Sequence, residues 1–175
     1  ILEEDKADLI VMARAQLADA QVCNKAKAGK VNNIKYCLGC NQGCYDYFCN
    51  SLYDPRIKHI TCMRNPALLE EDTLSLTPTA NPKNVMVIGG GVAGIEAAIN
   101  LKETGNTVKI YEKTDKLGGQ FALAGVIGAK ADFLNALNKS IKNVEELGIE
   151  VEYNRSICPK CISNIKPDVV VIASG

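Results

Sequence analysis

The strongest indication of the fold class lies in residues 85–94, Val85-Met86-Val87-Ile88-Gly89-Gly90-Gly91-Val92-Ala93-Gly94. An apolar strand pattern runs directly into a G-x-G-x-x-G turn, and a helical pattern follows over residues 92–104. Gly89 permits a tight turn, Gly91 lets a pyrophosphate approach the backbone, and Gly94 lets helix and strand pack closely. The stretch therefore predicts the first βα unit of a dinucleotide-binding domain. The alternative is a glycine turn that only packs a βαβ corner.

The pattern stays regular downstream of this turn. Apolar residues 108–111 predict a second strand, and residues 131–147 predict an amphipathic helix that Gly148 caps. Residues 149–153 and 168–173 predict two further strands. Alternating strands and helices indicate an α/β domain with a doubly wound parallel sheet.

Glu112 stands at the end of the second predicted strand. At this position an acidic side chain would accept hydrogen bonds from a ribose hydroxyl, and it disfavours a ribose that carries a 2′-phosphate. The G-x-G-x-x-G turn by itself does not distinguish an FAD site from an NAD site.

Composition excludes several partners. Lys and Arg together number 20, as do Asp and Glu, so no net charge favours nucleic acid or a membrane surface. The longest apolar stretch, residues 85–99, contains three consecutive glycines and Glu96, so it is unsuited to cross a bilayer. The first residues, Ile1-Leu2-Glu3-Glu4-Asp5, do not resemble a signal peptide. We expect a cytoplasmic protein.

The eight cysteines are the anomaly of the composition, and they indicate metal or redox chemistry. Cys37, Cys40, Cys44 and Cys62 give the spacing C-x2-C-x3-C-x17-C. Three clustered thiolates and a remote one are typical of a [4Fe–4S] cluster, whereas structural zinc more often uses two separated C-x2-C pairs. Zinc and free thiols are the alternatives, and Cys49 competes with Cys62 as the fourth ligand.

Cys158-Pro159-Lys160-Cys161 forms another C-x2-C pair. No second pair accompanies it, and we expect it on a connection between strands, not at the start of a helix where a reactive dithiol would have a lowered pKa. Inert thiols are the expectation, with a redox pair or half of a metal site as alternatives. His59, the single histidine, is expected to be a hydrogen-bonding loop residue.

A proline-containing segment helps to divide the chain. Residues 75–83 contain Pro78 and Pro82 and predict an extended linker. Upstream, the apolar run 7–13 predicts a buried strand, and helical sequence follows it. We therefore expect a βα unit over residues 1–31, a cysteine-rich segment over 32–74, the linker, and the dinucleotide-binding domain over 84–175.

Several segments match known sequence motifs: residues 7–19 resemble "ADLVAMGRPLLADP", 37–46 "CIGCNQGCLD", 61–66 "TCLVNP", 117–120 an "LGGQ" segment and 169–175 a "VVVATG" strand. By these motifs the chain resembles the iron–sulfur flavoenzymes of the NADH:flavin oxidoreductase family related to old yellow enzyme, which includes 2,4-dienoyl-CoA reductase, 2-enoate reductase and trimethylamine dehydrogenase. The resemblance runs through nearly the whole chain.

The resemblance implies the end of a TIM barrel, then a [4Fe–4S] segment, then the start of an FAD-binding Rossmann-like domain. It favours FAD over NAD at the glycine turn and Cys62 as the fourth cluster ligand. It also implies that Arg14 contacts the phosphate of an FMN held mostly by the rest of the barrel. The cofactor-binding candidates are Gly89, Gly91, Ala93, Gly94, Glu112, Lys113, Gly119, Gln120 and Arg14.

By this resemblance, electrons would pass from NAD(P)H, bound by a domain outside the chain, to FAD, through the cluster and to FMN, for reduction of an activated C=C bond. The alternatives are an amine dehydrogenase with ADP in the second domain, and a non-enzymatic electron-transfer module. The expected partners are the remainder of the polypeptide and a small unsaturated substrate. A homo-oligomer is a further possibility. We assign no catalytic side chain and expect residues 1–175 alone to be inactive.

Overall fold

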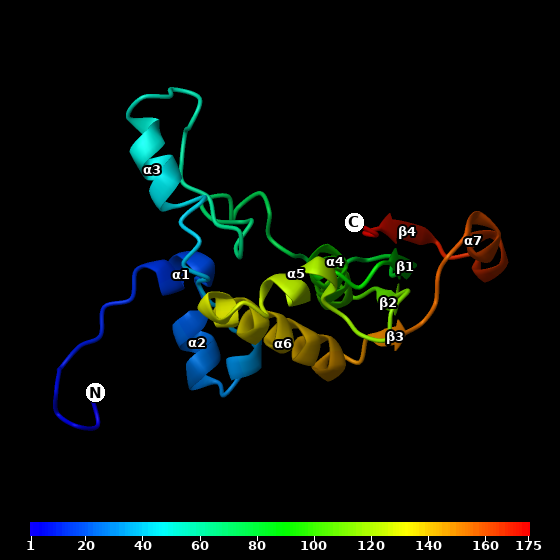
Figure 1. The fold of residues 1–175 in the computed structure, drawn as a ribbon, viewed down its shortest axis with the longest axis horizontal. Coiled ribbons are helices and arrows are strands. Elements are labelled where there is room, and N and C mark those ends of the chain that lie inside the picture. Colours follow the sequence, from blue (N-terminus) through cyan, green and yellow to red (C-terminus); the bar gives the residue numbers. More distant parts are fainter. The chain divides into compact units, whose positions relative to one another are not determined.

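The computed structural model describes residues 1–175, except for the side chain of Ala129. The chain divides into two compact units, Ile1–Leu74 and Ser75–Gly175. Figure 1 shows the short helices of the first unit and the sheet with its helices in the second.

A four-stranded sheet forms the centre of the second unit, and the strand order is β3-β2-β1-β4. All neighbouring strands are parallel, and Val85 of β1 lies opposite Val108 of β2 and Val169 of β4. The strands are β1 (Asn84–Ile88), β2 (Thr107–Tyr111), β3 (Glu150–Glu152) and β4 (Val169–Ile172). The predicted α/β fold with a parallel sheet is therefore confirmed, with the last two strands shorter at their ends than predicted.

Helices connect the strands, as a parallel sheet requires. They are α4 (Val92–Glu103), α5 (Gly119–Ala124), the short 3-10 helix η2 (Gly128–Lys130), α6 (Ala131–Glu146) and α7 (Pro159–Ile165). Gly148 follows α6 with φ +62°, and its N–H donates to the carbonyl of Glu145. This left-handed glycine ends the helix and turns the chain into β3. None of the described helices has the length and apolar character to cross a membrane.

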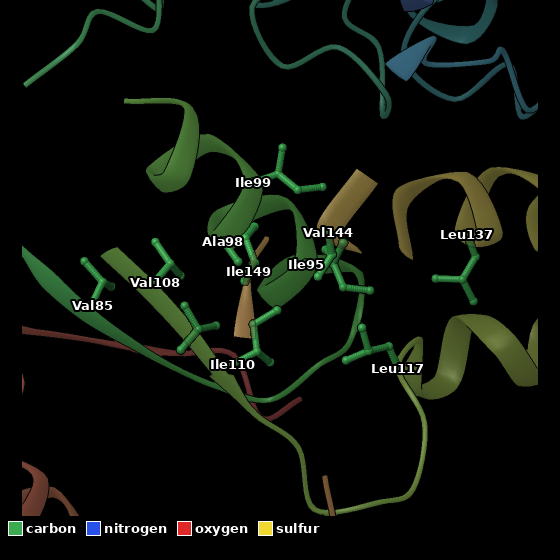
Figure 2. Packing of buried hydrophobic residues seen from close by; sticks show 11 residues of the cluster. Val85, Ile95, Ala98, Ile99, Val108, Ile110, Leu117, Leu137, Val144 and Ile149 are labelled. Atoms are coloured by element: carbon green, nitrogen blue, oxygen red, sulfur yellow. The ribbon is translucent and has the colours of Figure 1, made fainter. Parts of the chain in front are cut away.

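The core of the second unit lies between the sheet and the helices α4 and α6. Figure 2 shows Ile95 and Ala98 of α4 near Val108 and Ile110 of β2. Ile110 is fully buried, and Val144 of α6 belongs to the same cluster. Burying each such side chain stabilises the fold by about 1.5–3 kcal/mol, so this cluster fixes α4 against the strands that it connects.

The first unit consists of short helices held together by polar contacts. Its elements are α1 (Arg14–Ala18), α2 (Val22–Lys27), the 3-10 helix η1 (Val31–Asn33) and α3 (Tyr45–Ser51). The buried carboxylate of Asp19 accepts hydrogen bonds from Lys25 Nζ at 2.8 Å and from the Lys35 N–H at 2.9 Å. Burial would raise the pKa of Asp19, but the contacts with Lys25 and Lys35 lower it below its ordinary value. Asp19 thus joins α2 to the start of the cysteine-rich segment.

The strand predicted for residues 7–13 is absent from the described structure, where these residues are irregular. The side chains of Leu9 and Val11 are 83% and 93% exposed. An apolar run forms a buried parallel strand only when neighbouring strands pair with it, and the described part of the first unit has no strand that could do so. Residues 14–18 do form the helix α1.

The prediction for the Cys158–Cys161 segment was also wrong. We expected these residues on a connection between strands and not at the start of a helix; they do lie between β3 and β4, but Cys158 is the N-cap of α7 and Pro159 occupies its first turn. Proline is favoured at this position because its fixed φ suits a helix and its missing N–H would have had no partner there. The pair therefore begins a helix.

Candidate functional site

Close packing between backbone segments explains two of the glycines in the turn after β1. A β-carbon on Gly89 would overlap the carbonyl of Ala173, and one on Gly94 would overlap the carbonyl of Gly89. Gly89 has φ +107°, which favours glycine, and its N–H donates to the Tyr111 carbonyl at 2.8 Å. These two glycines therefore let β1, α4 and β4 approach one another.

Gly91 has a different environment. A β-carbon built on this residue would have no atom within 4 Å other than those of its chain neighbours, and its φ of −71° is accessible to any residue. Packing within the described chain therefore does not require glycine at position 91. The open space beside it fits the predicted approach of a pyrophosphate to the backbone.

The same space borders the first turn of α4. Gly91 is the N-cap, no side chain caps the helix, and the first turn contains no acidic residue. The first N–H groups of a helix have no partner within the helix, and they make its N-terminus positive. Ala93 is exposed in this turn, whereas Gly94 is buried against β1. An anionic pyrophosphate suits this end of the helix.

A second glycine turn lies beside the first. Gly118 is bridged to Gly91, and its N–H donates to the Gly90 carbonyl at 2.8 Å. A β-carbon on Gly119 would lie 3.4 Å from Gly91 Cα. Gly119 and Gln120 are both exposed at the start of α5. The structure therefore places the predicted "LGGQ" segment against the predicted pyrophosphate turn.

Glu112 is buried, with 7% of its surface exposed, and it joins β2 to the glycine turn. Its Oε2 accepts from the Gly90 N–H at 2.6 Å, and its Oε1 accepts from the Thr114 N–H at 2.8 Å and hydroxyl at 2.9 Å. Burial would raise the pKa of Glu112, but the donors on Gly90 and Thr114 and the nearby exposed Lys113 lower it below its ordinary value. A carboxylate has about four acceptor positions, so one remains for a ribose hydroxyl.

The four predicted cluster cysteines meet in the first unit. One pocket of this unit is lined by Arg14, Leu17, Cys37, Leu38, Cys40, Asn41, Gly43, Cys44, Thr61, Cys62, Met63 and Arg64. Within the described residues, no three Cys, His, Asp or Glu side chains form a group that could hold a single metal ion. The four cysteines thus line one pocket.

Backbone contacts bring the remote Cys62 to the other three cysteines. The Thr61 N–H donates to the Gly43 carbonyl at 2.7 Å, and a β-carbon on Gly43 would overlap the Thr61 backbone. Asn65 then anchors the turn after Cys62, because its side chain donates to the Leu17 carbonyl at 3.0 Å. The motif spacing gave no sign of the contact between Gly43 and Thr61.

Two other candidates have their own partners. Cys49 lies on α3 and is not among the lining residues; its thiol raises the pKa of the exposed Tyr45 through a hydrogen bond. His59 Nε2 lies 3.2 Å from Glu70 Oε1, and its Nδ1 lies 2.9 Å from the Ile60 carbonyl. The structure therefore separates both residues from the set of four cysteines.

Two arginines line the cysteine pocket. Arg14, predicted from the resemblance as a phosphate contact, donates to Asn41 Oδ1 at 3.3 Å. Arg64 was not singled out from the sequence, and its buried Nε has no hydrogen-bond partner among the described residues. The arginine in place of the apolar residue of the "TCLVNP" pattern is the signal that could have identified it. Both cations suit an anionic group between the four thiolates.

Comparison with known proteins gives an independent view of the chain. Residues 83–175, more than half of it, match the family described as pyridine nucleotide-disulphide oxidoreductase. The chain is 39% identical to a metal reductase of Desulforamulus reducens and 33% identical to a cinnamate reductase of Clostridium sporogenes, over 100% and 97% of its length. It spans about a quarter of each relative, 26% and 25%.

A solved structure shows the same fold. The complex of 2-naphthoyl-CoA reductase with 2-naphthoyl-CoA superposes with a TM-score of 0.89 at 31% sequence identity, covering 99% of this chain and 26% of that one. The likeness extends over both units of the chain, because nearly all of its residues are matched.

Proposed function

The chain belongs to the pyridine nucleotide-disulphide oxidoreductase family, and we propose that it is the part of an NAD(P)H-dependent iron–sulfur flavoprotein that holds a [4Fe–4S] cluster and FAD. In the complete protein these groups would serve the reduction of a C=C bond activated by a neighbouring carbonyl. FMN would be bound mostly by the remainder of the polypeptide, with Arg14 as one phosphate contact.

The observation that carries this proposal is the pocket lined by Cys37, Cys40, Cys44 and Cys62. A [4Fe–4S] cluster takes one thiolate at each iron, so its four ligands surround a volume. Three clustered cysteines and a remote one, all lining one pocket, favour the cluster over structural zinc, which more often takes two separated C-x2-C pairs.

The residues of the second unit would hold FAD through its pyrophosphate and ribose. The N–H groups at the start of α4 would donate to the pyrophosphate over Gly91, and Glu112 would accept from a ribose hydroxyl. When bound, the flavins and the cluster supply two-electron and one-electron transfer chemistry, respectively. The protein would hold FAD and the cluster, and it would place positive charge beside each of them, from the N-terminus of α4 and from Arg14 and Arg64.

The nature of the substrate rests on the relatives. Cinnamate reductase and 2-naphthoyl-CoA reductase are named for compounds whose reducible bonds are conjugated to a carboxylate or thioester carbonyl. We propose that the complete protein reduces a substrate of this class, and we assign no individual compound.

A cofactor inventory tests the proposal. The full-length protein, purified without oxygen, should contain about four iron and four sulfide atoms per chain, together with one FAD and one FMN. ADP in place of FAD would favour an amine dehydrogenase of the same architecture. Zinc without iron and sulfide would overturn the assignment of the cysteine pocket.

A further inference from the structure

Cys158 and Cys161 form a second pair of thiols, in a different unit from the cysteine pocket. Cys158 is the exposed N-cap of α7 and Cys161 lies one turn later, with intermediate exposure. Residues three positions apart lie on the same face of a helix, and the two Sγ atoms are 2.9 Å apart. A disulfide requires about 2.05 Å, so a small movement of the side chains would join them.

The surroundings of the pair favour thiol chemistry over metal binding. No third Cys, His, Asp or Glu among the described side chains completes a metal site with these two sulfurs. The pKa of the Cys158 thiol is lowered, first by the hydrogen bond from the Cys161 thiol and next by the Cys161 backbone N–H. A thiolate is the reactive form of cysteine, and solvent reaches Cys158 directly.

From this geometry we propose that Cys158 and Cys161 form a redox-active dithiol that exchanges with an external disulfide, with Cys158 as the attacking residue and Cys161 as the resolving residue. The site is distinct from the proposed cluster and FAD sites, and it does not depend on them. Its substrate class is an organic disulfide small enough to reach an exposed thiol.

The exchange is balanced in two steps. The Cys158 thiolate attacks one sulfur of the disulfide, forms a mixed disulfide and releases one thiolate of the substrate. Cys161 then loses its proton to solvent and attacks Cys158 Sγ, which forms the Cys158–Cys161 bond and releases the second thiolate. The protein dithiol is oxidised by two electrons, and the substrate disulfide is reduced to two thiols.

Tryptic mapping of the intact protein, with glutathione disulfide as the probe, tests the proposal. Trypsin cleaves after Lys160, between the two cysteines, so a Cys158–Cys161 disulfide keeps the two resulting peptides joined until a reductant is added. The expected result is a reversible joining of these peptides after anaerobic equilibration with glutathione disulfide. Peptides that remain separate, with both thiols free, would overturn the proposal.

Two variants assign the roles. In Cys161→Ser, Cys158 should retain a bound glutathione, because no thiol is left to resolve the mixed disulfide. In the wild type, the first reaction of Cys158 with glutathione disulfide should be about threefold to tenfold faster than that of the exposed Cys23 in the same molecule, which serves as the internal reference. In Cys158→Ser, Cys161 should react more slowly than Cys158 does. Equal rates at Cys158 and Cys23 would contradict the proposal.

Discussion

Gly91 differs from its neighbouring glycines because the space around its α-carbon is open. Gly91→Val should therefore leave the fold intact but weaken binding of FAD or ADP at least ~100-fold, about 2.7 kcal/mol, because the branched side chain occupies the space that the pyrophosphate needs. Titration of the purified protein with FAD and ADP measures this. Gly128→Val is the matched control, since a β-carbon there also meets nothing within 4 Å. Unchanged affinity in Gly91→Val would show that the turn only packs the corner.

Glu112 accepts hydrogen bonds at both of its oxygens. In Glu112→Gln one oxygen becomes an NH₂ group that faces another donor, so we expect the second unit to lose about 1.5–3 kcal/mol of stability at pH 7. Hydrogen exchange of β1 and β2 in the intact protein measures this, with the exposed Glu103→Gln as control.

The stability lost in Glu112→Gln should depend on pH. The folded pKa of Glu112 lies below its ordinary value of 4.5, so its stabilising contribution is complete above pH 4.5 and disappears as the pH falls through the folded pKa. The difference between wild type and Glu112→Gln should therefore shrink below pH 4.5. A difference that stays constant on acidification would contradict this account of the carboxylate.

Arg64 places a cation at the cysteine pocket, with its Nε buried and unpaired among the described residues. Removing the charge in Arg64→Met should disfavour the more negative reduced cluster and lower its midpoint potential by about 40 mV, equivalent to about 1 kcal/mol. A redox titration followed by electron paramagnetic resonance measures the shift. Arg56→Met is the control, because Arg56 pairs with Asp54 and does not line this pocket. An equal shift in both variants would argue against a specific role for Arg64.

At the scale of elements, contact between β1 and α4 depends on Gly94. A β-carbon there would overlap the Gly89 carbonyl, so Gly94→Ala should move the helix away from the strand and cost about 1–3 kcal/mol. Thermal or urea unfolding of the protein measures the loss. Gly91→Ala, in the same turn, should cost much less. Similar losses in the two variants would refute this division of roles between the glycines.

The sequence predicts the strands and the two longer helices, α4 and α6, of the second unit because each has a local signal. Apolar runs predict β1 and β2, and the helical pattern of residues 131–147 predicts α6 to within one residue at its end. Residues 7–13 carry the same kind of apolar run, but no described strand pairs with them. Local pattern therefore identifies a strand, whereas its formation depends on neighbours distant in sequence.

In the candidate sites, too, the sequence predicts the local motifs but not the contacts between residues distant in sequence. Motif spacing predicts the glycine turn and the set of four cysteines, and the structure places the four in one pocket. The hydrogen bond from the Gly90 N–H to Glu112 joins residues 22 positions apart. Neither residue type predicts this contact. The helix α7 was missed because it spans only seven residues, too few for a clear periodicity.

The whole chain combines two units, each with its own candidate site. The cysteine pocket lies within residues 1–74 and the glycine turns lie within residues 75–175. We therefore expect Gly91→Val to retain the iron and sulfide content of the wild type while it loses the dinucleotide. Loss of the cluster in that variant would show that the two sites depend on each other.

We propose that Cys37, Cys40, Cys44 and Cys62 hold a [4Fe–4S] cluster. The most direct measurement is the iron and sulfide content, with the electron paramagnetic resonance spectrum of the reduced protein, for Cys62→Ser and Cys49→Ser purified without oxygen. Cys62→Ser should lose the cluster and Cys49→Ser should keep it, because Cys62 lines the pocket and Cys49 does not. An intact cluster in Cys62→Ser, together with its loss in Cys49→Ser, would contradict the account.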